Sequence, residues 1–223
     1  MRNAGPDATP LAMQMFPGSA STSRLVHIVQ AALNTLVIAL FVLLAVVSYR
    51  HFTASRSVCS FSILAVNALF LGLFLSRRPA KSETPHLSLW LLSFTGTALP
   101  LLLRPTDGAG FVGVGIVMQI TGIVMVAAGL LSLRRSFAVV PGNRGIRDGG
   151  LYRIVRHPIY ISELIALLGA VLVSPTVTNW IIWLCECALQ FARARAEEDF
   201  LAADPVYRAY RERVPYRLLP GLL

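Results

Sequence analysis

Residues 150–160 have the sequence GLYRIVRHPIY and stand between a polar loop and an apolar run. Proline is favoured at the first position of a helix, where its missing N–H costs nothing, so Pro158 predicts a helix that begins there. The free N–H groups at such a helix start attract anions. Arg156 and His157 add donors around the same point, and Tyr160 follows within the first turn. This stretch therefore predicts an anion-binding pocket at the N-terminus of an apolar helix.

The apolar content of the chain predicts a membrane protein. Of 223 residues, 55% are hydrophobic and 14% are charged, and the mean hydropathy is +0.65, whereas soluble domains carry about 25% charged residues. A bilayer core requires apolar runs of roughly twenty residues. Six segments meet or approach this length: 25–48, 57–75, 86–103, 111–133, 159–173 and 176–192. They predict an all-α, polytopic membrane bundle of about six transmembrane helices, whose short last two segments form either a spanning or a re-entrant hairpin.

The positive charges are distributed unevenly across these predicted spans. The chain has 20 Lys and Arg against 11 Asp and Glu, a formal net charge of +9 and a pI near 10.3. With six spans, 17 of the 20 cations fall on one side, and only Arg50, Arg56 and Arg104 fall on the other. The positive-inside rule then places both termini in the cytoplasm, in a bacterial inner membrane or its equivalent. Topology explains the basicity, so we expect no nucleic-acid partner.

Three regions follow from the sequence. Residues 1–24 contain three prolines and a Ser/Thr cluster, which predicts a disordered tail. Residues 25–133 contain the first four apolar segments and few ionisable groups. Residues 134–223 contain the Arg-rich loops, the hairpin, and an amphipathic cytosolic helix that follows the last span and is broken at Asp204-Pro205. We expect the function to reside in this third region.

A second polar cluster, Arg193-Ala194-Arg195-Ala196-Glu197-Glu198, follows the last apolar segment. In a hairpin the start of one helix and the end of the next return to the same face, so this cluster is expected beside Arg156 and His157. Acids and cations together suit a zwitterionic cofactor that carries carboxylate, ammonium and ribose hydroxyl groups. Each cluster taken separately is also explained by positive-inside anchoring, or by a solvated helix face with i,i+4 pairs.

Two acidic residues, Glu163 and Glu186, fall within the apolar segments. Intramembrane acids are functional by default, although a neutral, hydrogen-bonded structural role fits them equally well. Tyr160 is either an aromatic-belt residue or a cation–π partner for a sulfonium. The cysteines and histidines lack the spacing of a zinc site, so no metal is expected. Close helix packing is predicted at four glycines: Gly113, Gly115, Gly122 and Gly129.

The C-terminal part of the chain also carries an ordered set of motifs. They are Ser136-Phe137, Gly145, Gly150-Leu151-Tyr152, Arg156-His157-Pro158-Ile159-Tyr160, Arg193-x-Arg195-x-Glu197-Glu198, Tyr207-x-x-Tyr210 and Arg213-Val214-Pro215. This order resembles the isoprenylcysteine carboxyl methyltransferase family and, more distantly, the phospholipid N-methyltransferases of the same membrane superfamily. The resemblance implies S-adenosyl-L-methionine as methyl donor, bound at the cytoplasmic end of the hairpin. It also implies a lipophilic acceptor that enters from the bilayer, such as a lipid or a prenylated small molecule or protein.

The resemblance assigns roles by position. Arg193 would be catalytic, orienting the acceptor; its guanidinium suits a carboxylate, which favours carboxyl O-methylation. Gln190 stands where the family often has Arg. The residues that would hold the cofactor are Arg156, His157, Pro158, Tyr160, Glu197 and Glu198.

Three alternative functions are open from the sequence. The first is a phospholipid N-methyltransferase. The second is an NADPH-dependent, sterol-reductase-like membrane enzyme, because such reductases have a similar Arg-His-Pro-x-Tyr motif. They typically have Asn where this chain has Ile159, and the adjacent acids Glu197 and Glu198 would repel the 2′-phosphate of NADPH. The third is a non-enzymatic membrane protein that retains the scaffold.

Overall fold

The computed structural model describes residues 20–56, 58–78, 80, 82–84, 86–104 and 110–221, which are mostly helical. The helices are α2 (Ala20–Ser55), α3 (Val58–Leu75), α4 (Leu87–Ala98), α5 (Val112–Leu133), α6 (Pro158–Val173), α7 (Val177–Leu201) and α8 (Pro205–Arg213). Short 3-10 turns lie at η1 (Leu99–Leu102), η2 (Arg134–Ser136) and η3 (Gly150–Arg153). The two-residue strands β1 (Ser82–Glu83) and β2 (Gly142–Asn143) pair antiparallel. The chain divides into two compact units, Met1–Leu36 and Val37–Leu223; the boundary falls within α2, and the other elements belong to the second unit.

The six predicted apolar segments are helical, with differences at their ends. Helix α2 extends beyond the predicted end at residue 48 to Ser55, and it begins at Ala20, inside the predicted 1–24 tail; residues 1–19 lie outside the described part. The segment 86–103 forms α4 and then η1, because Pro100 cannot donate to an α-helical hydrogen bond. Helix α7 continues past residue 192 to Leu201, so the separate amphipathic helix is α8 alone.

Two helical stretches in the described residues are long and apolar enough to cross a membrane, Ala31–Ala54 and Val112–Ser136. Three shorter apolar helices accompany them: Ile63–Leu75, Leu87–Leu102 and Pro158–Val173. Helix α6, with 16 residues, is about 24 Å long at 1.5 Å per residue. Six membrane-spanning helices were predicted, and two helical stretches have the length and composition to span a membrane.

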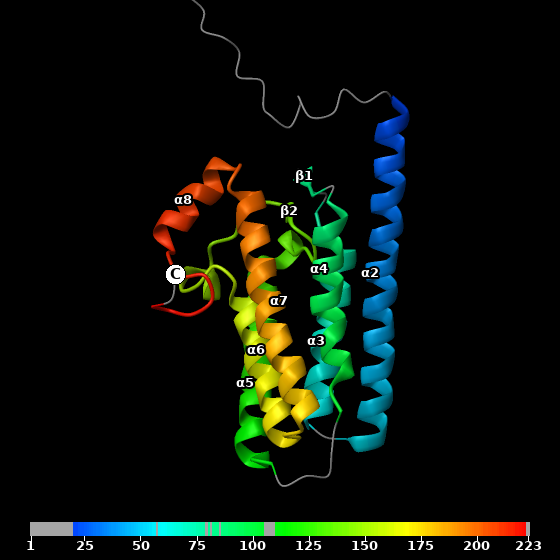
Figure 1. Cartoon of the computed structure of the whole chain (residues 1–223), viewed down its shortest axis with the longest axis vertical. Helices are drawn as coiled ribbons and strands as arrows, with labels where there is room; N and C mark the ends of the chain where they lie inside the picture. The colour runs from blue at the N-terminus through cyan, green and yellow to red at the C-terminus, as the bar shows by residue number, and fades with distance from the viewer. Residues whose placement is uncertain are drawn as a thin grey trace, which may run out of the picture. The chain divides into compact units, whose positions relative to one another are not determined.

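Helices α5 and α6 pack with their backbones in close approach (Figure 1). A Cβ atom added to Gly122 would lie 2.4 Å from the Ala166 nitrogen, and one added to Gly115 would lie 2.6 Å from the Gly169 oxygen. Gly129 similarly faces Ile159, at the start of α6. The predicted close packing is confirmed at these three glycines and is wrong for Gly113, which has no such atom within 4 Å. This packing fixes the position of α6 against α5.

Helices α6 and α7 form the predicted hairpin (Figure 1). The Thr176 hydroxyl caps α7 by accepting from the Asn179 N–H at 3.1 Å. The Asn179 amide donates to the carbonyls of Arg104 and Ser174 at 2.9 and 2.8 Å, and its oxygen accepts from the Arg104 N–H. The turn is thereby tied to the segment that follows η1. The start of α6 and the end of α7 both lie at the other end of the hairpin.

Helix α8 closes that end of the bundle with a tyrosine cluster. Asp204 caps α8 by accepting from the Val206 N–H at 2.8 Å, and Pro205 is the first helical residue. Tyr207 and Tyr210 are buried with Tyr152, and the Tyr210 hydroxyl donates to the Tyr152 carbonyl at 2.8 Å. The one-sided burial of α8 agrees with the predicted amphipathic helix.

Candidate functional site

The start of α6 is held by the C-terminal tail. His157 is the N-cap residue and Pro158 the first residue of α6, which confirms the predicted helix start. The N–H of Arg156 donates to the Tyr216 carbonyl at 2.9 Å, and the N–H of His157 donates to the Arg217 carbonyl at 3.0 Å. These two hydrogen bonds place the tail against the loop that enters α6. They also bring the Arg217 side chain to the end of α7.

Glu198 lies at the centre of a buried ion-pair network. Its two oxygens accept from Arg156 Nε and Nη2 at 2.8 and 3.3 Å, while Arg217 Nη2 donates at 2.9 Å. His157 Nε2 lies 3.2 Å from Oε1. The side chain is only 1% exposed. Burial by itself raises the pKa of Glu198, but the hydrogen bonds from His157, Arg217 and Arg156 hold that pKa well below its usual range.

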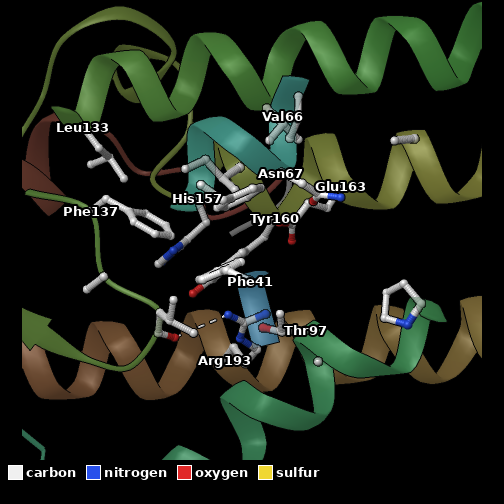
Figure 2. Close-up of a pocket in the computed structure, with 18 of the residues that line it drawn as sticks. Phe41, Val66, Asn67, Thr97, Leu133, Phe137, His157, Tyr160, Glu163 and Arg193 are labelled. Carbon is white, nitrogen blue, oxygen red and sulfur yellow. Dashed lines mark hydrogen bonds between the residues drawn. The ribbon is translucent and has the colours of Figure 1, made fainter. Parts of the chain in front are cut away.

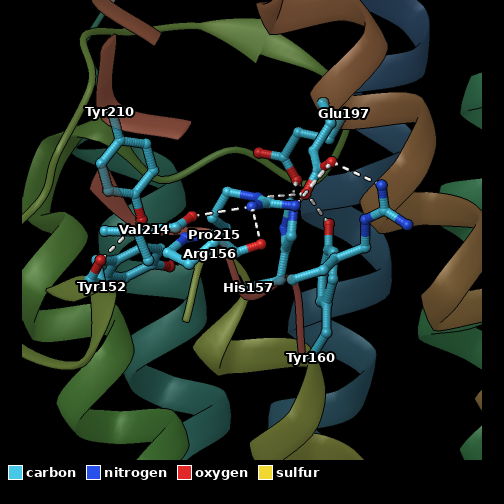
Figure 3. Close-up of polar contacts among 10 residues, drawn as sticks. Tyr152, Arg156, His157, Tyr160, Glu197, Tyr210, Val214 and Pro215 are labelled. Carbon is cyan, nitrogen blue, oxygen red and sulfur yellow. Dashed lines mark hydrogen bonds and ion pairs between the residues drawn. The ribbon is translucent and has the colours of Figure 1, made fainter. Parts of the chain in front are cut away.

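Arg156 extends this network to the tail. Its Nη1 donates to the Val214 carbonyl at 2.8 Å and also to the Pro215 carbonyl (Figure 3). A guanidinium presents its donors in a fixed plane, so one Arg can join a carboxylate and two carbonyls at once. Arg156 therefore ties together α6, α7 and the chain after α8.

Glu197 is more accessible than its neighbour. Its side chain is 30% exposed, and it accepts from the Tyr160 hydroxyl at 3.0 Å. His157 Nδ1 lies 3.7 Å from the same carboxylate, and the rings of His157 and Tyr160 stack with centroids 5.3 Å apart (Figure 3). The Arg193 guanidinium carbon lies 4.9 Å from the centroid of the Tyr160 ring, a cation–π contact. Cations, an aromatic ring and a partly exposed carboxylate thus share one small region.

A cavity of about 500 Å³ opens beside these side chains (Figure 2). This volume lies within the range of about 300–1,000 Å³ typical of small-molecule sites. Arg156, His157, Tyr160, Arg193 and Glu197 line it, together with mainly apolar side chains from α2, α3, α5 and α6. Examples of that apolar wall are Phe41, Leu44, Val66, Phe70, Ile123 and Leu167. The polar residues therefore stand at one part of a largely hydrophobic chamber.

A second polar layer lies deeper in the hairpin. The Gln190 amide nitrogen donates to Glu163 at 2.7 Å and to Glu186 at 2.8 Å, and its oxygen accepts from Arg193 Nη1 at 3.1 Å. Glu163, Glu186 and Arg193 all line the cavity. Gly96 of α4 stands against Arg193, because a Cβ atom there would lie 3.0 Å from the Arg193 Cδ. This layer connects the two acids within the apolar segments to the predicted site.

The predicted polar clusters are thus neighbours, as the hairpin required. Arg156 and His157 meet Glu198, Tyr160 meets Glu197 and Arg193, and the buried Pro158 supports the helix start. Three participants were not predicted: Arg217, the linking role of Gln190, and Arg144. Arg144 is buried, lines the cavity and donates to the Arg78 carbonyl; burial and the nearby Arg77 lower its pKa to about 10. Only the basic composition of the 134–149 loop hinted at Arg144. Among the residues described by the structure, no three His, Cys, Asp or Glu side chains gather as metal ligands.

The fold and the site define a membrane-associated helical protein with a polar site that opens into an apolar chamber. A family model described as phospholipid methyltransferase matches residues 110–208, from the start of α5 to the first turn of α8. The segment is thus similar to a family of the integral-membrane methyltransferase superfamily, which includes the isoprenylcysteine carboxyl methyltransferases. The match covers the hairpin and both polar clusters, and it supports a membrane methyltransferase. No curated protein matches the chain.

Proposed function

We propose that the chain is an S-adenosyl-L-methionine-dependent integral-membrane methyltransferase that acts on a lipophilic acceptor. The observation that carries this proposal is the polar site at the open end of the α6–α7 hairpin, which lines the same cavity as a wall of apolar side chains. A soluble, charged donor and a hydrophobic acceptor can meet only where such surfaces adjoin. The family match over residues 110–208 supports methyl transfer as the reaction.

The residues present suit the proposed cofactor. Arg156 and His157 line the cavity, where the guanidinium of Arg156 would place positive charge beside a bound carboxylate, and Glu197 supplies a partly exposed acceptor for an ammonium or ribose hydroxyl. The Tyr160 ring offers a π-face of the kind that attracts a sulfonium. When bound, the cofactor supplies a methyl group on a positively charged sulfur. Glu198 belongs to this site as a positioning residue, because both its oxygens are engaged by Arg156, His157 and Arg217.

The residues of the chain would align the two reactants and exclude water from the cavity. Methyl transfer is an in-line displacement, so holding the reactants in register in a dry chamber supplies much of the acceleration. The apolar wall from α2, α3 and α5 would hold the hydrophobic part of the acceptor. Arg193, positioned by Gln190 and Tyr160, would orient the acceptor at the boundary between the polar site and this wall.

The sequence motifs favour a carboxylate acceptor beside Arg193, and hence carboxyl O-methylation. The matched family, by its description, favours a phospholipid acceptor. Both acceptors require the same cofactor site at the hairpin end. The two acceptors differ in the side chains that they require beside the reacting group, in the deeper layer of the cavity.

The proposed topology uses α2 to α7 as six membrane crossings with both termini in the cytoplasm, in a bacterial inner membrane or its equivalent. The distribution of 17 cations on one side and three on the other supports it. Residues 134–223 then form the catalytic region, with the site at the cytoplasmic surface and α8 lying in the cytosol.

Calorimetry on the detergent-solubilised full chain tests the proposed cofactor. S-adenosylhomocysteine, the demethylated cofactor, is expected to bind, whereas NADPH is expected not to bind because Glu197 repels its 2′-phosphate. Glu197→Gln should weaken S-adenosylhomocysteine binding about tenfold, the value of one hydrogen bond to a charged group. Glu212→Gln, on the exposed face of α8, is the matched control. Binding of NADPH alone would instead support the reductase, and binding of neither would contradict both enzymes.

A further inference from the structure

The two tyrosines of the Tyr207-x-x-Tyr210 motif lie on the buried face of α8 but use their hydroxyls differently. Each residue is 3% exposed, and the ring centroids lie 5.9 Å apart. The Tyr210 hydroxyl donates to the Tyr152 carbonyl at 2.8 Å. The Tyr207 hydroxyl is buried and has no hydrogen-bond partner among the residues that the structure describes. The hydroxyl of Tyr210 therefore stabilises the fold, whereas that of Tyr207 is available for another partner.

The unpartnered hydroxyl belongs to a residue that lines the cavity. Tyr207 contributes to the cavity lining together with the other aromatic and aliphatic side chains of its packing cluster. We refer to this part of the lining as the tyrosine wall; it consists of Leu133, Ile146, Tyr152, Leu201, Tyr207 and Tyr210. A buried polar atom without a partner is destabilising, so a hydroxyl of this kind at a cavity wall indicates that a ligand group completes it.

The hydroxyl of Tyr207 remains protonated beside the proposed cofactor site. Burial, followed by the negative charges of Glu198 and Glu197, raises the pKa of Tyr207 well above its usual range. A tyrosine hydroxyl that keeps its proton can both donate and accept a hydrogen bond. Tyr207 can therefore bind either a ring nitrogen or an amino group of a ligand.

The chemistry of the tyrosine wall indicates which part of a ligand it binds. Aromatic and branched aliphatic side chains favour contact with a flat ring, which they cover by stacking and apolar contact. A wall with one neutral hydroxyl disfavours a charged group, since burying a charge requires a paired counter-charge. S-adenosyl-L-methionine contains a carboxylate, an ammonium, a sulfonium, a ribose and an adenine ring. Of these, the adenine ring alone is flat, uncharged and polar only at its edge.

We propose that the tyrosine wall holds the adenine ring of the cofactor and that the Tyr207 hydroxyl forms a hydrogen bond with the edge of that ring. This inference rests on the proposed function, because it assigns one part of the same cofactor. Tyr207 is then a residue that determines specificity for the base. In the view of Figure 3, Tyr152 and Tyr210 lie on one side of Arg156 and Tyr160 lies on the other. A cofactor with its sulfonium at Tyr160 would extend past Arg156 to reach the wall.

The ligand-free protein tests whether the Tyr207 hydroxyl is free of a structural role. Tyr207→Phe removes a hydroxyl without a partner, so the apparent Tm in detergent should stay the same or rise. Tyr210→Phe, one turn further along α8, removes the donor to the Tyr152 carbonyl, so the apparent Tm should fall. An equal fall in the two variants would show that the Tyr207 hydroxyl has a structural partner, and would overturn the inference.

Calorimetry on the purified full chain then measures recognition of the base. The probes are S-adenosylhomocysteine and its 1-deaza, 3-deaza, 7-deaza and 6-desamino analogues, each of which lacks one polar group of the ring edge. Tyr207→Phe should weaken S-adenosylhomocysteine binding about fivefold, the value of one neutral hydrogen bond. Tyr49→Phe, the same change at a residue that is 59% exposed on α2, should leave the affinity unchanged.

The analogues identify the partner of the Tyr207 hydroxyl through a double-mutant cycle. At least one analogue should bind the wild-type protein more weakly than S-adenosylhomocysteine does, and Tyr207→Phe should abolish that difference because one partner has already been removed. Glu197→Gln should weaken S-adenosylhomocysteine binding but preserve the difference between the analogues, since it acts on the polar part of the cofactor.

The possible failures are distinguishable. If S-adenosylhomocysteine binding weakens in Glu197→Gln but not in Tyr207→Phe, the proposed function is supported and the inference about Tyr207 is overturned. The inference is also overturned if each analogue loses the same affinity in the wild-type protein as in Tyr207→Phe. Failure of the wild-type protein to bind S-adenosylhomocysteine would contradict the proposed function instead.

Discussion

The adjacent glutamates Glu197 and Glu198 offer a sharp test, because the same substitution should have very different effects at the two positions. Glu198 is 1% exposed and accepts from both Arg156 and Arg217, with His157 at 3.2 Å. Glu197 is 30% exposed and accepts from the Tyr160 hydroxyl alone among these hydrogen bonds. Glutamine preserves shape at either site but removes the negative charge.

The magnitudes follow from these partners. In Glu198→Gln the new amide N–H groups face the donors of one arginine. The buried Arg156 and the partly exposed Arg217 both lose their counter-charge. Removing one partner of a buried ion pair costs about 3–5 kcal/mol, and the contacts of one carboxylate are not additive. In Glu197→Gln the amide oxygen can still accept from Tyr160, so the loss of stability is about 1 kcal/mol or less.

Thermal unfolding in detergent, followed by intrinsic fluorescence, measures the difference. We expect the apparent Tm to fall by roughly 10 °C in Glu198→Gln and by no more than about 3 °C in Glu197→Gln. Calorimetry should show that Glu197→Gln, although nearly as stable as the wild-type protein, binds S-adenosylhomocysteine more weakly. Equal stability of the two variants would refute the assignment of Glu198 as the buried organiser of the site.

Three further predictions follow from the same geometry. Because the folded-state pKa of Glu198 is depressed, its contribution to stability is complete above the ordinary Glu pKa of about 4.3 and is lost as the pH falls below it; the apparent Tm of the wild-type protein should drop there, and that of Glu198→Gln should lack this component. Gly122→Ala should destabilise by about 1–3 kcal/mol because its Cβ would lie 2.4 Å from the Ala166 nitrogen, whereas Gly113→Ala in the same helix should be neutral or stabilising in the same unfolding assay. Arg193→Lys should retain S-adenosylhomocysteine binding but lower methyl transfer about tenfold or more, since an ammonium cannot reproduce the forked hydrogen-bond donors of a guanidinium held over the Tyr160 ring; unaltered transfer would remove Arg193 from the acceptor site.

Local sequence rules predict the parts of the structure that depend on neighbours along the chain. The helix start at Pro158, the α6–α7 turn and the break at Asp204-Pro205 are set by proline and by short-range capping. The meeting of Arg156 and His157 with Glu198 follows from one further step, because a hairpin returns its two ends to the same face.

Contacts between residues far apart in the sequence are not marked by such local sequence patterns. Arg217 reaches Glu198 only because the tail pairs through its backbone with residues 156 and 157, and no periodicity in the sequence marks that pairing. The strands β1 and β2 have two residues each, which is too short for an alternating pattern. The role of Gln190 depends on which face of α7 meets Glu163 across the hairpin. Glu186, Gln190 and Arg193 follow one another at i, i+4 and i+7 and so share one face of α7, but the sequence does not show which helix that face meets.

In the proposed reaction, the open end of the α6–α7 hairpin passes a methyl group to a lipid-soluble acceptor. Native membranes containing the full chain, incubated with methyl-labelled S-adenosyl-L-methionine and then extracted with organic solvent, provide the test. We expect label in the lipid fraction for the wild-type protein and for Glu212→Gln, and a loss of most of that label for Glu197→Gln. A lipid fraction without label, from wild-type protein shown to bind S-adenosylhomocysteine, would contradict the proposed methyl transfer to lipid.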